Sequence, residues 1–152
     1  MPAEPHASAT LDWTDQLCPV ARTVDLIGEK WSLLIIRDAM DGARSFTEFQ
    51  QRTGIARNIL ADRLRRLTER GILTQRTAPS GRRRQYILTP AGRDLLTTIS
   101  ALRQWGERHA FNKGERHSTL LDDAGNRVPS LALVSRDGRA LDVESVRVVR
   151  DE

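Results

Sequence analysis

Residues 46–89 read FTEFQQRTGIARNILADRLRRLTERGILTQRTAPSGRRRQYILT, and they contain several predicted elements in direct succession. The first is a short amphipathic helix over residues 46–52, which ends at Thr53-Gly54. The second is a longer helix whose apolar residues recur at i, i+1, i+5 and i+8: Ile59, Leu60, Leu64 and Leu67. This spacing matches the 3.6-residue period of a helix, so these four residues share one face. We expect that apolar face to be buried and the opposite face to be exposed. The outward residues are Arg57, Asn58, Ala61, Asp62, Arg65 and Arg66.

Two strand-like runs follow the helix stop at Arg70-Gly71. They span residues 72–76 and 85–89, and the turn between them, residues 78–84, carries three consecutive guanidinium groups. This order of elements is typical of a winged helix-turn-helix: a helix, a tight turn, a second helix with a basic outward face, and a hairpin with arginines at its tip. The sequence therefore predicts a mainly α fold of the α+β type and a DNA-binding unit.

Length and composition limit what the rest of the chain can be. With 152 residues it can form one domain with a core and a small appendage. The N-terminus lacks the basic-then-apolar order of a signal peptide, and no apolar run approaches the ~20 residues that span a bilayer. A single cysteine, Cys18, excludes an internal disulfide framework and a cysteine-based zinc cluster. We therefore expect a soluble cytoplasmic protein that does not bind membranes.

Positive charge is concentrated in the middle of the sequence. Residues 44–112 carry fourteen basic and five acidic side chains, a net charge of +9, whereas residues 1–43 carry −4 and residues 113–152 carry −1. A basic patch that coincides with a helix-turn-helix pattern is typical of nucleic-acid binding. The alternative is a solvated surface of mixed charge.

Two helices are expected before the helix-turn-helix pattern. One begins at Cys18-Pro19, with proline in the first turn, and ends near Gly28. The other covers residues 30–40 and is apolar nearly all round, so we expect it to be the most buried element. Residues 1–12, rich in proline and small residues, are expected to form a flexible arm.

Short motifs occur in order along the chain: CPVA at 18–21, DLIG at 25–28, KW at 30–31, LLI at 33–35, RSFTEF at 44–49, NIL at 58–60, RL at 63–64 and LTPAG at 88–92. Together, over about residues 17–110, they resemble the HxlR family of bacterial, MarR-like winged-helix regulators. The resemblance implies a homodimeric transcription factor that usually acts on a nearby operon. Some members of that family sense electrophiles, quinones or oxidants.

The chain departs from the family pattern at the start of the second helix. Many relatives begin the recognition helix with Ser-Pro, whereas this chain has Ala56-Arg57. Loss of a side-chain cap costs about 1 kcal/mol, while an arginine at the helix start is well placed for a phosphate or a base. We expect the departure to change the DNA contacts more than the fold.

Thr89-Pro90 predicts the start of a long helix that runs to about His109. Its apolar residues recur at helical spacing and are Leu95, Leu96, Ile99, Leu102 and Trp105. The family resemblance implies that this helix forms the dimer interface together with the N-terminal helix. The alternative is that it completes the core of a monomer. Residues 13–112 would then form one DNA-binding and dimerisation domain.

Residues 113–152 are expected to form a small C-terminal β-hairpin extension. Turns at residues 122–126 and 137–138 separate short apolar runs, and residues 146–149 are a candidate third strand. The first turn has the composition of a calcium loop but lacks the distal glutamate, so an ordinary turn is predicted.

The predicted DNA contacts fall on both helices and on the wing. The first outward positions of a helix in the major groove reach base edges, where arginine can bind guanine and asparagine can bind adenine. An arginine-rich wing fits a narrow minor groove or its flanking phosphates. Arg63 is expected to join the helices instead. The predicted set is Thr47, Arg57, Asn58, Asp62, Arg65, Arg82, Arg83 and Arg84.

Two parts of this set have structural alternatives. Asp62 can pair with Arg65 or Arg66 on the helix surface, because these residues lie three and four positions further on. The arginines at 82–84 can form a solvated loop, although three like charges in one turn are unfavourable without an anion.

The sequence contains no catalytic or metal-binding pattern. The histidines His6, His109 and His117 have no metal-ligand spacing with another ligand. A glycine-rich phosphate loop, a nucleophile elbow and a paired-carboxylate signature are all missing. We therefore expect no enzyme activity, no metal and no cofactor.

Cys18 is a candidate redox-sensing residue. It precedes Pro19 at a helix start, where unpaired backbone N–H groups and the positive end of the helix dipole favour a thiolate. Arg22, four residues on, is expected to add to this effect. The alternative is an inert, partly buried thiol.

Two functions compete. The first is a DNA-binding homodimer on an inverted-repeat operator, released by a small effector or by thiol oxidation. The second is a winged-helix protein-interaction module that does not bind DNA. Clustered arginines on the outward helix face and on the wing favour the first.

Overall fold

The protein divides into two compact units, the first ending at Leu96 and the second beginning at Thr97. The structure, a computed structural model, describes residues 12–150. The flexible arm predicted for residues 1–12 therefore lies outside the described residues, except for Asp12. The predicted division into residues 13–112 and 113–152 differs from this structural boundary, and as a functional division it stays a prediction.

Four helices of the first unit confirm the predicted pattern. They are α1 (Pro19–Ile27), α2 (Lys30–Met40), α3 (Phe46–Thr53) and α4 (Arg57–Glu69). A capping box starts α3, since the Ser45 hydroxyl accepts the Glu48 N–H at 3.1 Å and the Glu48 carboxylate accepts the Arg44 N–H at 3.1 Å. Gly54 ends α3 in the left-handed conformation, with φ of 69°, which lets the chain turn directly into α4.

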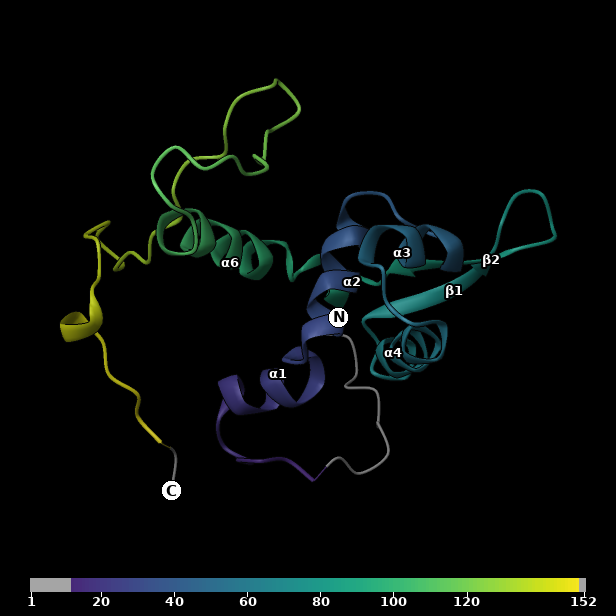
Figure 1. The fold of residues 1–152 in the computed structure, drawn as a ribbon. Coiled ribbons are helices and arrows are strands. Elements are labelled where there is room, and N and C mark those ends of the chain that lie inside the picture. The colour runs from purple at the N-terminus through teal and green to yellow at the C-terminus, as the bar shows by residue number, and fades with distance from the viewer. Residues whose placement is uncertain (1–11, 151–152) are drawn as a thin grey trace. The chain divides into compact units, whose positions relative to one another are not determined.

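The core of this unit forms where α2 contacts α3 and α4, and α3 contacts α4 (Figure 1). Lys30 is the one exposed residue of α2, which confirms that this helix is deeply buried. On α4, Leu60, Leu64 and Leu67 are buried as predicted, and Ile59 is half-buried. The largest fully buried side chains are Phe49, Ile35, Ile36, Leu60, Leu64, Leu67 and Leu73.

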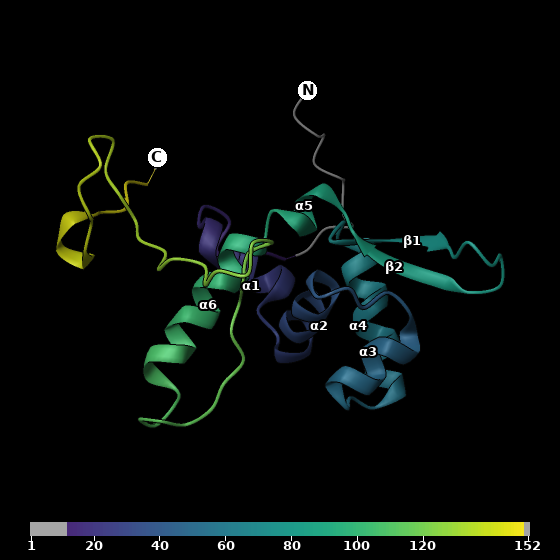
Figure 2. The ribbon, with the colours of Figure 1, turned by 90° about the horizontal axis from the view of Figure 1, so that it is seen from above.

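The wing consists of β1 (Leu73–Thr77) and β2 (Arg84–Leu88), which pair antiparallel with Leu73 opposite Leu88 and Thr77 opposite Arg84. Both strands lie within one residue of the predicted bounds. The turn between them extends beyond α3 and α4 in both views (Figures 1 and 2). The Tyr86 N–H donates to the Arg44 carbonyl at 2.7 Å, so β2 is hydrogen-bonded to the loop before α3.

The single long helix predicted from Thr89 to about His109 is interrupted. α5 (Pro90–Arg93) is followed by a turn at Asp94-Leu95, and α6 (Leu96–His109) begins after it. Thr89 caps α5 as predicted, its hydroxyl accepting the Gly92 N–H at 3.1 Å. The Leu95 N–H donates to the Gly92 carbonyl, three residues back, so the last turn tightens instead of continuing as an α-helix.

The second unit contains most of α6 and the C-terminal segment. Gln104 on α6 joins the two, donating to the Pro129 carbonyl at 3.0 Å and accepting the Leu131 N–H at 2.7 Å. This explains why α6 belongs structurally with residues that the sequence assigned to a separate extension.

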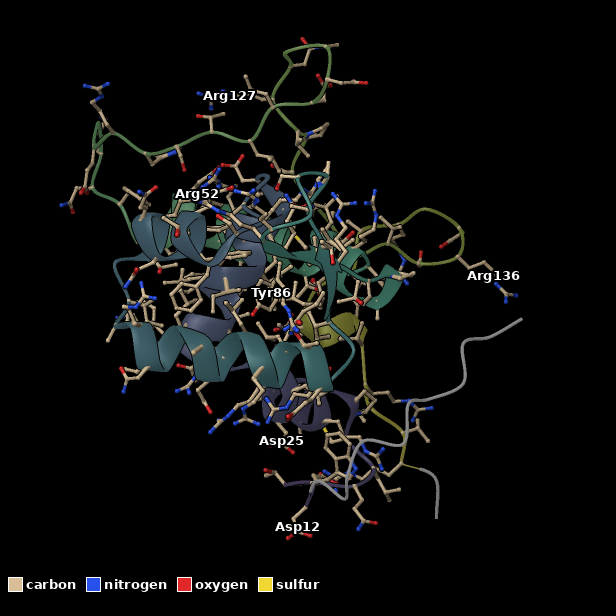
Figure 3. The ribbon with its side chains drawn as sticks, turned by 90° about the vertical axis from the view of Figure 1, so that its right-hand side faces the viewer. Asp12, Asp25, Arg52, Tyr86, Arg127 and Arg136 are labelled. Carbon is tan, nitrogen blue, oxygen red and sulfur yellow. The ribbon has the colours of Figure 1, made fainter. Side chains whose placement is uncertain are left out.

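The C-terminal segment has the two predicted turns but little strand. Each turn is closed by one isolated antiparallel bridge, Leu121 with Arg127 and Val134 with Ala140. Arg136 projects outward from the second turn (Figure 3). The candidate third strand at residues 146–149 is wrong, since those residues have no regular structure, and a short 3-10 helix, η1 (Val143–Ser145), precedes them. Between residues 12 and 150 no helix is long and apolar enough to cross a membrane.

Candidate nucleic-acid interface

The N-terminus of α4 presents two of the predicted DNA-binding side chains. Arg57 and Asn58 are both exposed in its first turn, and Ala56 at the N-cap makes no side-chain cap bond. The Arg57 guanidinium lies over the Phe46 ring, 4.9 Å from its centroid, and donates to the Gln50 amide oxygen at 3.3 Å. Thr47 is exposed on α3, next to Phe46. Residues from both helices of the helix-turn-helix therefore meet at this end of α4.

Asp62 is the centre of an ion-pair cluster on α4. Its carboxylate accepts hydrogen bonds from Arg63 at 2.5 Å and Arg65 at 2.8 Å, and Arg66 lies 3.0 Å away. Desolvation raises the pKa of Asp62, but these hydrogen bonds and the neighbouring guanidinium charges outweigh it and hold the pKa below its usual value. The structure thus shows Asp62 in the surface pairing that was the alternative to a DNA contact, and its contact with DNA stays a prediction.

Arg65, also predicted to contact DNA, is held by two carboxylates in the free protein. Besides Asp62, it donates to Glu69 at 3.0 Å, one helical turn further along. An arginine with two anionic partners must exchange them before it can bind a phosphate or a base. The contribution of Arg65 to DNA binding is therefore expected to be smaller than that of Arg57.

Arg63 joins the recognition helix to the core, as the sequence predicted. Its Nε donates to Glu29 at 2.9 Å, and Glu29 is the N-cap of α2, where it also accepts the Ser32 N–H at 3.0 Å. Desolvation raises the pKa of Glu29, but the hydrogen bonds from Arg63 and from the backbone at the start of α2 lower it to about 2. One carboxylate thus positions α4 against the start of α2.

The wing presents Arg82 and Arg83 in its turn, both exposed. Arg84 is the first residue of β2 rather than part of the turn, and it donates to the Gln75 side chain of β1 at 2.9 Å. Among the described residues no carboxylate lies within ion-pair distance of Arg57, Arg82 or Arg83. These cations remain available to an anionic partner.

Cys18 lies outside this surface, at the N-cap of α1. Its Sγ accepts the Ala21 N–H at 3.4 Å, and the thiol is partly exposed. Arg22, which was expected to act on the thiol, donates from its Nε to the Gln16 carbonyl at 2.9 Å, and its guanidinium stacks on Trp13, 4.7 Å from the ring centroid. Its effect on Cys18 stays a prediction.

The structure also reveals residues that sequence reasoning missed. Gln50 holds Arg57, and Arg44 hydrogen-bonds through its backbone to both Glu48 and Tyr86. The contacts between Gln50 and Arg57 and between Arg44 and Tyr86 have no signal in the sequence, because each joins separate elements of the fold. Across residues 12–150 no group of three or more histidine, cysteine, aspartate and glutamate side chains is placed to hold a metal ion.

Residues 26–114 match the model of the HxlR-like helix-turn-helix family. The chain belongs to this family. The resemblance predicted from the motifs is therefore confirmed. Among HxlR-like relatives, the uncharacterized HTH-type transcriptional regulator MT3179 of Mycobacterium tuberculosis is 43% identical over 91 residues, which are 59% of this chain and 58% of MT3179. The match thus spans little more than half of that relative's length.

Two solved structures resemble this chain over different shares of its length. PA1607, a candidate transcription factor, superposes with a TM-score of 0.86 at 46% identity, over 90% of this chain and 97% of PA1607. The redox regulator HypR in its reduced form has a TM-score of 0.57 at 30% identity, over 61% of this chain and 94% of HypR. The predicted winged-helix fold class is confirmed by these neighbours.

Proposed function

We propose that this protein is a homodimeric transcriptional regulator that binds an inverted-repeat operator in duplex DNA. The observation that supports the proposal is which of its arginine side chains form ion pairs with carboxylates and which do not. Arg57 at the start of α4 and Arg82 and Arg83 at the wing tip are exposed and have no carboxylate partner among residues 12–150, while Arg63 and Arg65 form ion pairs within the protein. The HxlR-like family and the transcription-factor neighbours support the same function.

Dimerisation is supported by apolar side chains that the single chain leaves exposed. On and before α1 these are Leu17, Val20 and Val24, with Val20 70% exposed; on α6 they include Leu102 and Trp105, the latter 59% exposed. Such residues are usually covered by a partner when they cluster on a helix face. A second copy of the chain is the partner that the family resemblance implies.

The first test is the oligomeric state and the operator geometry. We expect a dimer in sedimentation at micromolar concentration, and selected genomic fragments with two half-sites about 34 Å apart, because paired recognition helices enter successive major grooves. A monomer in sedimentation, or a single asymmetric site in the selected fragments, would contradict the proposed assembly.

The roles of helix and wing can be separated by mutation. Arg83→Ala is expected to weaken binding to all sequences and to lower the salt dependence by about one counterion. Asn58→Ala is expected to lose discrimination at one base pair, about 1–3 kcal/mol. Fluorescence anisotropy on operator and random duplexes over a salt series measures both. Arg136→Ala, which removes an exposed turn arginine from the second unit, is the control. Equal losses for Asn58→Ala on both duplexes would refute base reading by Asn58.

We further propose that Cys18 releases the protein from DNA when it is oxidised or alkylated. Its Sγ accepts the Ala21 N–H at the start of α1 and is partly exposed, so a small oxidant or electrophile can reach it. The neighbour HypR is itself named a redox regulator. Since the sequence has one cysteine, a disulfide must join two chains or one chain and a small thiol.

We expect diamide, which takes one hydrogen from each of two thiols as they form a disulfide, to release the protein from its operator. Cys18→Ser should stay bound under the same treatment, as measured by anisotropy, with mass spectrometry identifying the linked species. If Cys18→Ser responds as the parent does, the thiol is not the switch and a non-covalent effector becomes the better explanation.

A further inference from the structure

The first unit contains a cleft lined by arginines, apart from the surface formed by α4 and the wing tip. It is a cleft of about 360 Å³ between the end of α2, the loop before α3, the wing and α5. Arg44 of the loop, Arg76 of β1 and Arg93 of α5 line it, and no acidic residue does. Its size falls in the lower part of the range that holds small-molecule ligands.

Within the part of the chain that the structure describes, no carboxylate forms an ion pair with the three arginines of this cleft. Arg76 donates to the Gln85 side chain at 3.1 Å, which is a neutral partner. Neither Arg44 nor Arg93 forms a salt bridge within residues 12–150. Three arginines lining one concavity give it a positive potential, and the guanidinium of each can donate charge-assisted hydrogen bonds to an anion.

Apolar side chains also line the cleft. Met40 from α2 and Ile87 and Leu88 from β2 line it, and all three are half-buried. A bare inorganic phosphate or a DNA phosphate would leave these side chains without a partner. A molecule with an apolar body and one anionic group satisfies both kinds of wall.

We propose that the cleft binds a small organic anion of this kind, with its carboxylate held by Arg44, Arg76 and Arg93 and its apolar body against Met40, Ile87 and Leu88. Binding of the anion to the cleft does not depend on the proposed function. The effect of that binding on DNA affinity does rest on it, because the anion would then be the effector of the proposed regulator.

The position of Arg44 connects the cleft to the DNA-binding elements. Its carbonyl accepts the N–H of Tyr86 on β2 at 2.7 Å, and its own N–H donates to Glu48 in the capping box of α3 at 3.1 Å. The residue whose side chain lines the cleft therefore also ties the wing to α3. A ligand that draws Arg44 and Arg76 together acts on the spacing between wing and helix-turn-helix.

Binding can be tested without DNA by calorimetry with three probes: benzoate, 2-naphthoate and octanoate. At least one is expected to bind saturably at millimolar concentration or below, whereas inorganic phosphate and the neutral 2-naphthol are not. Arg93→Gln and Arg76→Gln should each weaken binding about tenfold or more, since a charged hydrogen bond is lost. Arg116→Gln, which removes an exposed arginine from the second unit, should leave it unchanged.

Three results would overturn the proposal: no binding of any organic anion, equal binding of phosphate, or equal losses in Arg93→Gln and Arg116→Gln. The effect on DNA is then measured separately, as the shift in operator affinity when the bound probe is added to the parent and to Arg93→Gln. If the parent binds the probe but not DNA, the proposed function fails while the cleft stands. If it binds both and the probe leaves operator affinity unchanged, the cleft is a binding site but not the effector site.

Discussion

Replacing Gly92 with alanine is expected to destabilise the first unit by about 3 kcal/mol, at the upper end of the usual cost of overpacking. A β-carbon at Gly92 would lie 2.3 Å from the Ile72 carbonyl oxygen and 3.0 Å from Leu88 Cδ2. The oxygen belongs to backbone and already accepts the Thr89 N–H at 3.0 Å, so it is not free to withdraw. Urea unfolding followed by circular dichroism measures the loss.

Gly106→Ala is the matched control for this substitution. Gly106 lies in the interior of α6, and a β-carbon there would meet no atom within 4 Å. Alanine is preferred over glycine inside helices by roughly 0.5–1 kcal/mol, so this variant should be slightly stabilised. Similar destabilisation in both variants would mean that the close approach of α5 to Ile72 does not decide the outcome.

The close contact between α5 and Ile72 also explains why the interruption between α5 and α6 was not predicted. The apolar residues from Leu95 to Trp105 keep a helical period, and no proline or glycine falls on the turn at Asp94-Leu95. The length of α5 is set by tertiary contacts. Thr89 is hydrogen-bonded to the Ile72 carbonyl, and Gly92 packs against the same carbonyl. By contrast, the starts of α1 and α3 were predictable, since Pro19 and the Ser45–Glu48 capping box act through neighbouring residues alone.

In the candidate interface, as in the fold, contacts between neighbouring residues could be predicted and contacts between distant residues could not. The pairing of Asp62 with Arg65 and Arg66 could be foreseen from their spacing on one helix. The bond between Arg63 and Glu29 crosses 34 positions, and the cleft brings together Arg44, Arg76 and Arg93 from three separate elements. The sequence predicted that Arg63 joins helices, but no periodicity identifies Glu29 as its partner or relates the three arginines of the cleft, so only the folded chain reveals these contacts.

The C-terminal segment was over-predicted as strand for a related reason. Asp122 stabilises its turn locally, accepting the N–H groups of Ala124 and Asn126 at 2.9 Å each, and this much was predictable. Strands additionally need neighbours across several residues and a buried face. Leu121, Leu133 and Val134 are instead exposed, so one bridge closes each turn and pairing goes no further.

Phe49→Ala is expected to destabilise the first unit by about 3–5 kcal/mol, because a fully buried aromatic side chain is lost and a cavity remains. Phe49 is the one buried residue of α3, so it anchors this helix to the core. Phe111→Ala, the same chemical change at a partly exposed position in the second unit, should cost less than about 1 kcal/mol. Urea midpoints compare the two variants.

DNA-binding measurements distinguish a residue that anchors the interface to the core from a residue that contacts DNA directly. Phe49 is buried and offers no atom to a nucleic acid, yet α3 carries Thr47 and holds Arg57 through Phe46 and Gln50. At a temperature where Phe49→Ala is still folded, operator affinity should fall together with affinity for random DNA, because the whole interface becomes less ordered. Asn58→Ala, by contrast, should keep its stability and lose only discrimination. If Phe49→Ala is destabilised as expected but binds operator with unchanged affinity, the surface formed by α3 and the start of α4 is not where DNA binds.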